Sequence, residues 1–140
     1  MLAQIILGPS SLIQASLPYI LEHTGNDFYQ SLNTTLENQA NACIALLKSV
    51  PGLRPVAPQG AMYVMVEVLI DQFHDIKDDV DFCKKLLEAE NVMVLPGQAF
   101  NAPNFFRIVI CAPHPVLTEA FERIQEFCQR NLKNKKARTN

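Results

Sequence analysis

The chain has 140 residues, of which 49% are hydrophobic and 19% are charged, with a formal net charge of -2. This length and composition fit one globular domain with a core of its own, which can still be part of a longer protein. The slightly acidic balance excludes a global basic field, so we expect neither nucleic acid nor a membrane as a partner, and no run approaches the roughly 20 apolar residues of a membrane span.

Four cysteines, at positions 43, 83, 111 and 128, form no Cys-x-x-Cys pair, and no histidines stand at ligand spacing. Neither a zinc site nor a redox motif is predicted, and reduced thiols favour a cytoplasmic protein. The apolar opening, residues 1–7, lacks a basic flank and stops at Gly8-Pro9, which argues against a signal peptide. It has no preceding polar turn, as we expect of a segment inside a larger fold.

Two helices are predicted in the first third of the chain. Ser10 or Ser11 can cap a helix that ends near residue 24, with Pro18 as a kink. From Asp27 to Val50, apolar residues recur at helical spacing, which predicts a helix of about 24 residues and roughly 36 Å. A helix of this length is either a strut between two bodies or a packed core helix.

Residues 51–60 contain prolines at positions 51, 55 and 58 and are predicted to form an extended loop without a regular element. A half-buried strand follows over residues 61–68. One face of this strand carries Met62, Val64, Val66 and Val68, and the other carries Tyr63, Met65 and Glu67.

Asp78 is predicted to cap the next helix, with Asp79 in its first turn. The positive end of the helix dipole is a sufficient reason for carboxylates there. The residues predicted to face inward are Val80, Cys83 and Leu87, and those predicted to be solvated are Lys84 and Lys85.

The last third of the chain predicts two strands and a helix. A short apolar strand over residues 92–95 stops at Pro96-Gly97, and a loop leads into a second strand over residues 105–110. The final helix has the clearest periodicity, with Leu117, Phe121, Ile124, Phe127 and Cys128 on one face. The order of elements predicts an α+β fold in which helices pack on one face of a three-stranded sheet. The basic residues at the end predict a solvated tail over residues 134–140, with a binding patch as the alternative.

Arg107 is the one permanently charged residue in the apolar strand 105–110. Strand alternation places it with Phe105 and Val109 on one face, and because both faces are apolar we expect both to be covered. A guanidinium removed from water needs a partner, and its planar fork suits a carboxylate or a phosphate. An internal ion pair, for example with Glu67, a strand end that reaches solvent, and a ligand anion all remain open at this point.

Outside Arg107 the residues offer no recognisable catalytic group. The three histidines sit at loop or element ends without a nucleophile or carboxylate at a motif spacing, and we predict surface or structural roles for them. Glycines are few and isolated, so no glycine-rich phosphate cradle is predicted. The chain therefore contains one candidate binder.

Five motifs follow one another in the order of a known family: Leu7-Gly8-Pro9-Ser10-Ser11, Pro51-Gly52-Leu53-Arg54-Pro55, Gly60-Ala61-Met62-Tyr63-Val64-Met65, Val94-Leu95-Pro96-Gly97-Gln98-Ala99-Phe100 and Phe106-Arg107-Ile108. Together they resemble the C-terminal part of class I pyridoxal-phosphate aminotransferases, over residues 5 to 130. Members that act on aromatic amino acids such as tyrosine are the most similar. The resemblance implies that Arg107 holds the α-carboxylate of the amino-acid or 2-oxo-acid substrate.

The resemblance also implies a division of the chain and a missing part. Residues 1–26 would be the last helix region of a cofactor domain, 27–50 a connecting helix, and 51–133 the small domain of a fold-type I aminotransferase that closes over substrate. Pyridoxal 5'-phosphate would be bound mainly by the missing domain, which carries the family's cofactor lysine, and no residue here is assigned to the cofactor, to a metal or to catalysis. The full-length protein would be a homodimer, with Ser10 near the partner subunit's site.

Two hypotheses follow from these patterns. The first is the C-terminal part of an aromatic-amino-acid aminotransferase, incomplete for catalysis on its own. The second is a non-catalytic module that keeps the small-domain fold and uses its uncovered surface, including the apolar residues 1–7, for protein association.

Overall fold

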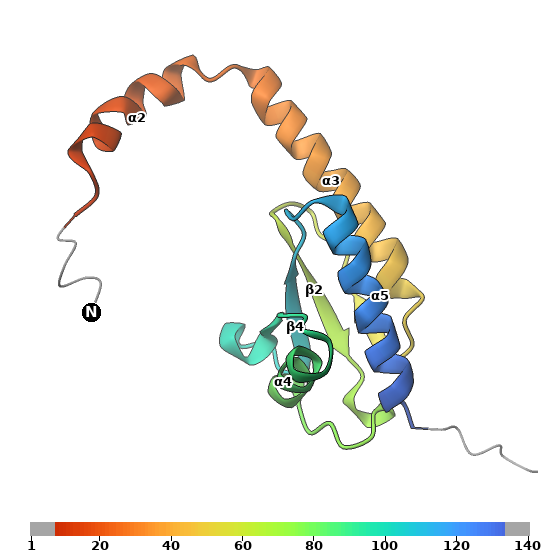
Figure 1. Cartoon of the computed structure of the whole chain (residues 1–140). Coiled ribbons are helices and arrows are strands. Elements are labelled where there is room, and N and C mark those ends of the chain that lie inside the picture. The colour runs from red at the N-terminus through yellow and green to blue at the C-terminus, as the bar shows by residue number, and fades with distance from the viewer. Residues whose placement is uncertain (1–7, 134–140) are drawn as a thin grey trace, which may run out of the picture. The chain divides into compact units, whose positions relative to one another are not determined.

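The computed structural model describes residues 8–133, so the apolar opening and the predicted basic tail lie outside the described part. The chain divides into two compact units, Met1–Thr34 and Thr35–Asn140. Helix α3, Asn26–Lys48, contributes to both (Figure 1). No helix within residues 8–133 has the length and apolarity that a membrane crossing requires.

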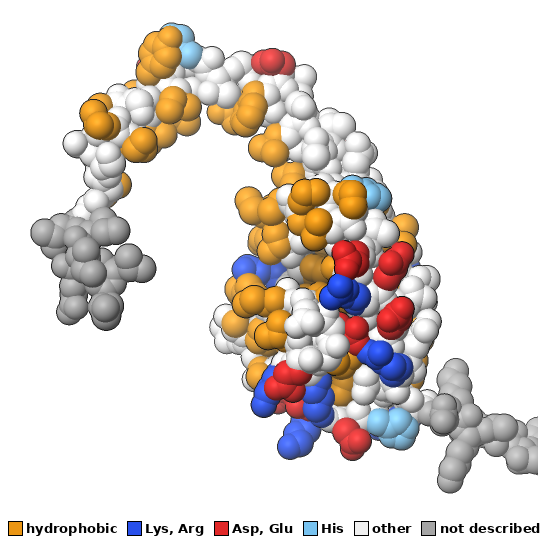
Figure 2. Space-filling model, in the orientation of Figure 1, with side chains coloured by type: hydrophobic (Ala, Val, Ile, Leu, Met, Phe, Trp, Pro, Cys, Tyr) orange, Lys and Arg blue, Asp and Glu red, His pale blue; other side chains and the backbone are white. Residues whose placement is uncertain are grey.

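The first unit contains helix α2, Ser11–His23, which confirms the first predicted helix. Ser10 is its N-cap residue, but the Ser10 side chain makes no capping hydrogen bond, and Pro18 lies inside the helix. No residue of α2 is buried, and Leu12 is 81% exposed. Figure 2 shows the apolar side chains along this segment, which form a surface without cover in the described residues.

Helix α3 confirms the predicted long helix and begins one residue earlier than expected. Its buried residues are Ala40, Cys43, Ile44 and Leu47, which all lie in its C-terminal part. The first half of the helix therefore contributes nothing to the core of the second unit.

The second unit contains a four-stranded antiparallel sheet in the order β1-β2-β4-β3. The strands are β1 Leu53–Pro55, β2 Tyr63–Val68, β3 Leu95–Pro96 and β4 Phe105–Val109. The α+β class is confirmed, but the predicted count of three strands is wrong. Strand β1 lies in the segment predicted as irregular, where Pro55 is tolerated because β1 is an edge strand and pairs on one side only.

Strand β3 is shorter than predicted, because it begins at Leu95 rather than at residue 92. Val92 and Val94 nevertheless reach the core, at 8% and 6% exposure, from the extended segment before the strand. On β2 the predicted alternation is confirmed for Val64, Val66 and Val68, whereas Met62 precedes the strand and is exposed.

Helices α4, Asp79–Glu90, and α5, His114–Asn131, complete the core together with the end of α3 (Figure 1). All five residues predicted for the buried face of the last helix are buried. The prediction for α4 is wrong at two of three positions, because Val80 and Leu87 are each 44% exposed. The buried residues of α4 are Asp79, Phe82, Cys83 and Leu86, so the inward face follows the helical spacing from Asp79 rather than from Val80.

Candidate arginine site

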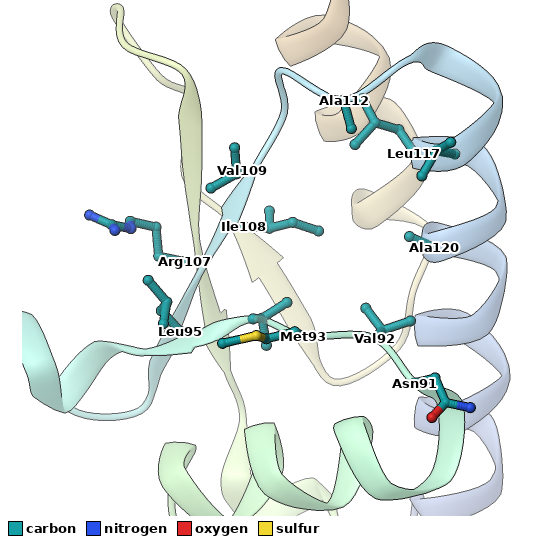
Figure 3. A pocket seen from close by; sticks show the side chains of 12 residues that line it. Asn91, Val92, Met93, Leu95, Arg107, Ile108, Val109, Ala112, Leu117 and Ala120 are labelled. Carbon is teal, nitrogen blue, oxygen red and sulfur yellow. The ribbon is translucent and has the colours of Figure 1, made fainter.

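Arg107 lies in the middle of β4, on the sheet face opposite the core of the second unit. Its neighbours Phe106 and Ile108 are buried, at 0% and 6% exposure, and the ring of Phe106 stacks on Phe82 at 5.5 Å between centroids. Figure 3 shows Ile108 pointing toward α5 and Arg107 pointing the other way. The predicted alternation is confirmed, but the expectation of two covered faces is wrong, because Val109 on the Arg107 face is 44% exposed.

Two aromatic rings flank the guanidinium. Its Cζ lies 4.9 Å from the ring centroid of Tyr63, on β2, and 4.2 Å from that of Phe100, in the 3-10 helix η2, Gly97–Phe100. Cations over ring faces are attracted by the ring quadrupole, and the rings also displace water from the guanidinium. These contacts hold the planar group in place without using any of its N–H donors.

No donor of Arg107 is used by an ion pair within the described residues, and the buried Nε of the guanidinium has no hydrogen-bond partner there. A buried polar atom without a partner is uncommon in native proteins because it costs free energy. The arrangement is chemically suited to a planar anion, such as a carboxylate, that accepts two parallel hydrogen bonds.

Glu67, the internal carboxylate considered for Arg107, pairs elsewhere. Its Oε2 accepts a hydrogen bond of 2.9 Å from Nη1 of Arg54, which lies directly opposite on β1. The residue opposite Arg107 on β2 is Met65, and on β3 it is Leu95. The register of the sheet thus pairs Glu67 with Arg54, and the residues opposite Arg107 are apolar.

Asp79 is a buried carboxylate, although its place in the first turn of α4 predicts only an interaction with the helix dipole. It is 0% exposed and accepts hydrogen bonds from the backbone and side-chain nitrogens of Gln98 and from the backbone nitrogen of Asn104. Burial by itself raises the pKa of Asp79, but these hydrogen bonds together outweigh it and keep that pKa below its ordinary value. Its neighbour Asp78 does cap α4 as predicted, by accepting from the Asp81 nitrogen at 2.8 Å.

A hollow of about 250 Å³ lies beside β4, between the segment after α4 and the start of α5 (Figure 3). Its lining is mainly apolar and includes Met93, Val109, Val116, Leu117 and Ala120. Arg107 borders this hollow, but its guanidinium points away from it. The hollow and the arginine site are therefore separate features.

The remaining reactive groups do not gather around Arg107. All four cysteines are free, and burial raises the pKa of the Cys43, Cys83 and Cys128 thiols to about 12, so they stay protonated at neutral pH. Within residues 8–133 no cluster of His, Cys, Asp or Glu is arranged to hold a metal ion. The two lysines of α4 form ion pairs with carboxylates of the same helix. Lys84 lies 3.8 Å from Glu88, and Lys85 lies 2.9 Å from Asp81.

Comparison with known proteins gives a consistent picture. A family model described as aminotransferase class I and II matches residues 1–124. The tyrosine aminotransferase of Mus musculus is 42% identical over 130 residues, covering 93% of this chain and 29% of that protein. The tyrosine aminotransferase of Dictyostelium discoideum is 44% identical over 135 residues, covering 94% of this chain and 32% of that protein. The chain thus spans about a third of the length of these relatives.

Solved structures agree with the sequence comparison. Tyrosine aminotransferase from Leishmania infantum superposes with a TM-score of 0.83 at 38% identity and covers 94% of this chain and 32% of its own. Aspartate aminotransferase from Rhizobium meliloti gives a TM-score of 0.79 at 32% identity, covering 88% of this chain and 32% of its own. The predicted fold-type I arrangement is confirmed by these neighbours.

Proposed function

Because the chain belongs to the class I and II aminotransferase family, we propose that it is the C-terminal part of an enzyme that moves an amino group between an aromatic L-amino acid, such as tyrosine, and a 2-oxo acid. The substrate class comes from the tyrosine aminotransferases that the chain matches at 42% and 44% identity. In this proposal Arg107 binds the α-carboxylate of the substrate.

The observation that carries this proposal is the unsatisfied fork of Arg107 on an open sheet face. The rings of Tyr63 and Phe100 lie 4.9 and 4.2 Å from Cζ of Arg107 and use none of its N–H donors, so the guanidinium can donate to both carboxylate oxygens of a substrate. Fixing the carboxylate orients the bonds at the α-carbon, and covering the open face excludes water and strengthens the ion pair. Orientation and closure are the contributions of this chain.

The family depends on pyridoxal phosphate, which supplies the electron sink for chemistry at the α-carbon. The described residues do not fit a site for it. Lys84 and Lys85 are taken up by carboxylates on the outside of α4, and no glycine-rich turn opens a helix in residues 8–133. We therefore assign the cofactor site to the part of the enzyme that this chain does not contain, and no step of the reaction to its lysines.

We further propose that residues 1–26 belong to the cofactor domain, that 27–50 is a connecting helix, and that 51–133 is the small domain. The burial pattern of α3 supports this division, because only its C-terminal part enters the core. A homodimer of the full-length protein would use the exposed apolar residues of α2. The four free thiols support a reducing, cytoplasmic location.

A chimera tests the proposed function directly. The chain replaces the matching third of the tyrosine aminotransferase of Mus musculus, which supplies the remaining length. We expect amino transfer from tyrosine to a 2-oxo acid. A chimera that folds, binds the cofactor and fails to act on tyrosine would contradict the proposal.

The isolated chain is expected not to take up pyridoxal phosphate on a defined lysine. The reason is that its described lysines are exposed or half exposed, and those on α4 pair with carboxylates of the same helix. The purified chain is mixed with the cofactor, reduced with borohydride and digested, and adducts are mapped by mass spectrometry. Stoichiometric labelling of a single lysine would show that a cofactor site has been overlooked.

The isolated chain is also expected to bind a dye that fluoresces on apolar surfaces, and to self-associate. The residues responsible are those of α2, where Leu12, Ile13, Ile20 and Leu21 are at least half exposed. A matched variant with Ile13→Lys and Leu21→Lys should lose much of the fluorescence. A dye-silent monomer by light scattering would favour the alternative function, a stand-alone module without a missing domain.

A further inference from the structure

Among the residues of the second unit that the structure describes, 35–133, Asp79 is the one buried charged side chain. Its Oδ1 accepts from Nε2 of Gln98 at 2.9 Å and from the backbone nitrogen of Asn104 at 3.1 Å, and its Oδ2 accepts from the backbone nitrogen of Gln98 at 2.9 Å. A carboxylate removed from water is tolerated only when its oxygens are satisfied in this way. Both carboxylate oxygens therefore accept hydrogen bonds from one segment, residues 97–104.

That segment is fixed at both of its ends. Gln98, near its start, is held by two of the Asp79 contacts, and Asn104, at its end, is held by the third. The carbonyl oxygen of Asn104 also accepts from the nitrogen of Val68 on β2, at 2.7 Å. Asn104 has φ of 66°, in the left-handed region that asparagine adopts more readily than most residues, and these hydrogen bonds fix its position there.

The anchored segment contains one wall of the arginine site and leads into its strand. Phe100, between the two anchor points, places its ring 4.2 Å from the Arg107 guanidinium. Asn104 directly precedes β4, whose third residue is Arg107. A displacement of residues 97–104 would therefore move both the ring and the start of the strand.

We propose that Asp79 is a positioning residue that sets Phe100 and Arg107 relative to one another by anchoring residues 97–104 to the start of α4. The consequence for substrate binding rests on the proposed function, but the positioning itself does not. The competing explanation is a carboxylate that only stabilises the α4 N-terminus, as Asp78 does. In that case its removal would weaken the helix without altering the arginine site.

The test uses the intact chain and the Nε–Hε nuclear magnetic resonance signal of Arg107. A proton near the face of an aromatic ring is shifted by the ring current, so this signal reports where Phe100 lies. The signal is assigned by its loss in Arg107→Lys, and Phe100→Leu shows where it moves when the ring is removed. Neither measurement depends on cofactor or activity, so a failure here is distinct from a failure of the proposed function.

We expect Asp79→Asn to shift the Arg107 signal in the same direction as Phe100→Leu, because the amide nitrogen that replaces one carboxylate oxygen cannot accept, so at least one hydrogen bond to residues 97–104 is lost. The matched control is Asp78→Asn, which changes the neighbouring carboxylate and should leave the signal in place. An Arg107 signal that stays in place in folded Asp79→Asn would overturn the proposal.

A second variant covers the case in which Asp79→Asn does not fold. Gln98→Ala removes only the side-chain contact to Asp79, at an exposed position, and leaves both backbone contacts. We expect a smaller shift in the same direction. If Gln98→Ala leaves the Arg107 signal unmoved, the anchoring does not control the arginine site and the proposal is wrong.

Discussion

In the chimeric enzyme, Arg107→Lys is expected to lower kcat/KM roughly 30-fold to 1,000-fold, with little change in melting temperature. This corresponds to a loss of about 2–4 kcal/mol in transition-state stabilisation. Lysine keeps the charge but is a point donor, so it cannot match both carboxylate oxygens at once. The melting temperature should hold because Arg107 makes no ion pair among residues 8–133 whose loss would cost stability. Steady-state kinetics with tyrosine and thermal melts on the same preparation measure both quantities.

Arg54→Lys is the matched control for this experiment. Arg54 lies on the same sheet, its side chain is 68% exposed, and its pair with Glu67 is a surface ion pair of the kind worth about 0–1 kcal/mol. We expect it to change neither kcat/KM nor the melting temperature appreciably. The opposite pattern for Arg107→Lys, a large drop in melting temperature with near-normal kcat/KM in the folded fraction, would remove Arg107 from the substrate site.

Local periodicity was enough to predict most of the fold. The long helix α3, the buried face of α5 and the alternation of β2 and β4 all follow from apolar spacing, which is a local property of the sequence. The family resemblance and its closeness to tyrosine aminotransferases, predicted from five short motifs, were also confirmed. These features need no knowledge of which segments meet in space.

The missed features depend on contacts between distant segments. Strand β1 has three residues, one of them proline, and exists because Leu53 lies opposite Val68, which no local pattern reveals. The inward face of α4 is predicted wrongly because the helix dipole is a sufficient reason for Asp79, so its burial is not expected. A burial pattern that begins with a charged side chain is recognisable only once its hydrogen-bond donors, near residue 100, are known.

The surroundings of Arg107 depend on distant segments for the same reason. The oddness of Arg107 in an apolar strand was visible in the sequence, and so was its need for an anion. Its setting was not, because Tyr63 and Phe100 reach it from β2 and η2. The sequence also does not reveal that Glu67 pairs with Arg54 rather than with Arg107, because this depends on the pairing of β1 with β2.

Gly97→Ala is expected to lower the free energy of unfolding by about 3 kcal/mol, the upper range for forcing extra volume into a packed site. An added Cβ would lie 2.1 Å from the carbonyl oxygen of Ala102 and 2.8 Å from the Cβ and the carbonyl oxygen of Phe105. Backbone oxygens cannot rotate out of the way as a flexible side chain does. The Ala102 nitrogen also bonds to the Gly97 oxygen at 3.0 Å, so the two segments cannot separate without losing that bond. Urea unfolding followed by circular dichroism measures the change.

Gly60→Ala is the control, because nothing lies within 4 Å of a Cβ added there. That substitution should be neutral or raise the free energy of unfolding by about 0.4–1 kcal/mol, since it only restricts the unfolded chain. Comparable losses for both variants would mean that the close contact at Gly97 is not what limits the site. A loss confined to Gly97→Ala would instead show that residues 97–104 are packed too tightly to move independently of the start of β4, the strand that carries Arg107.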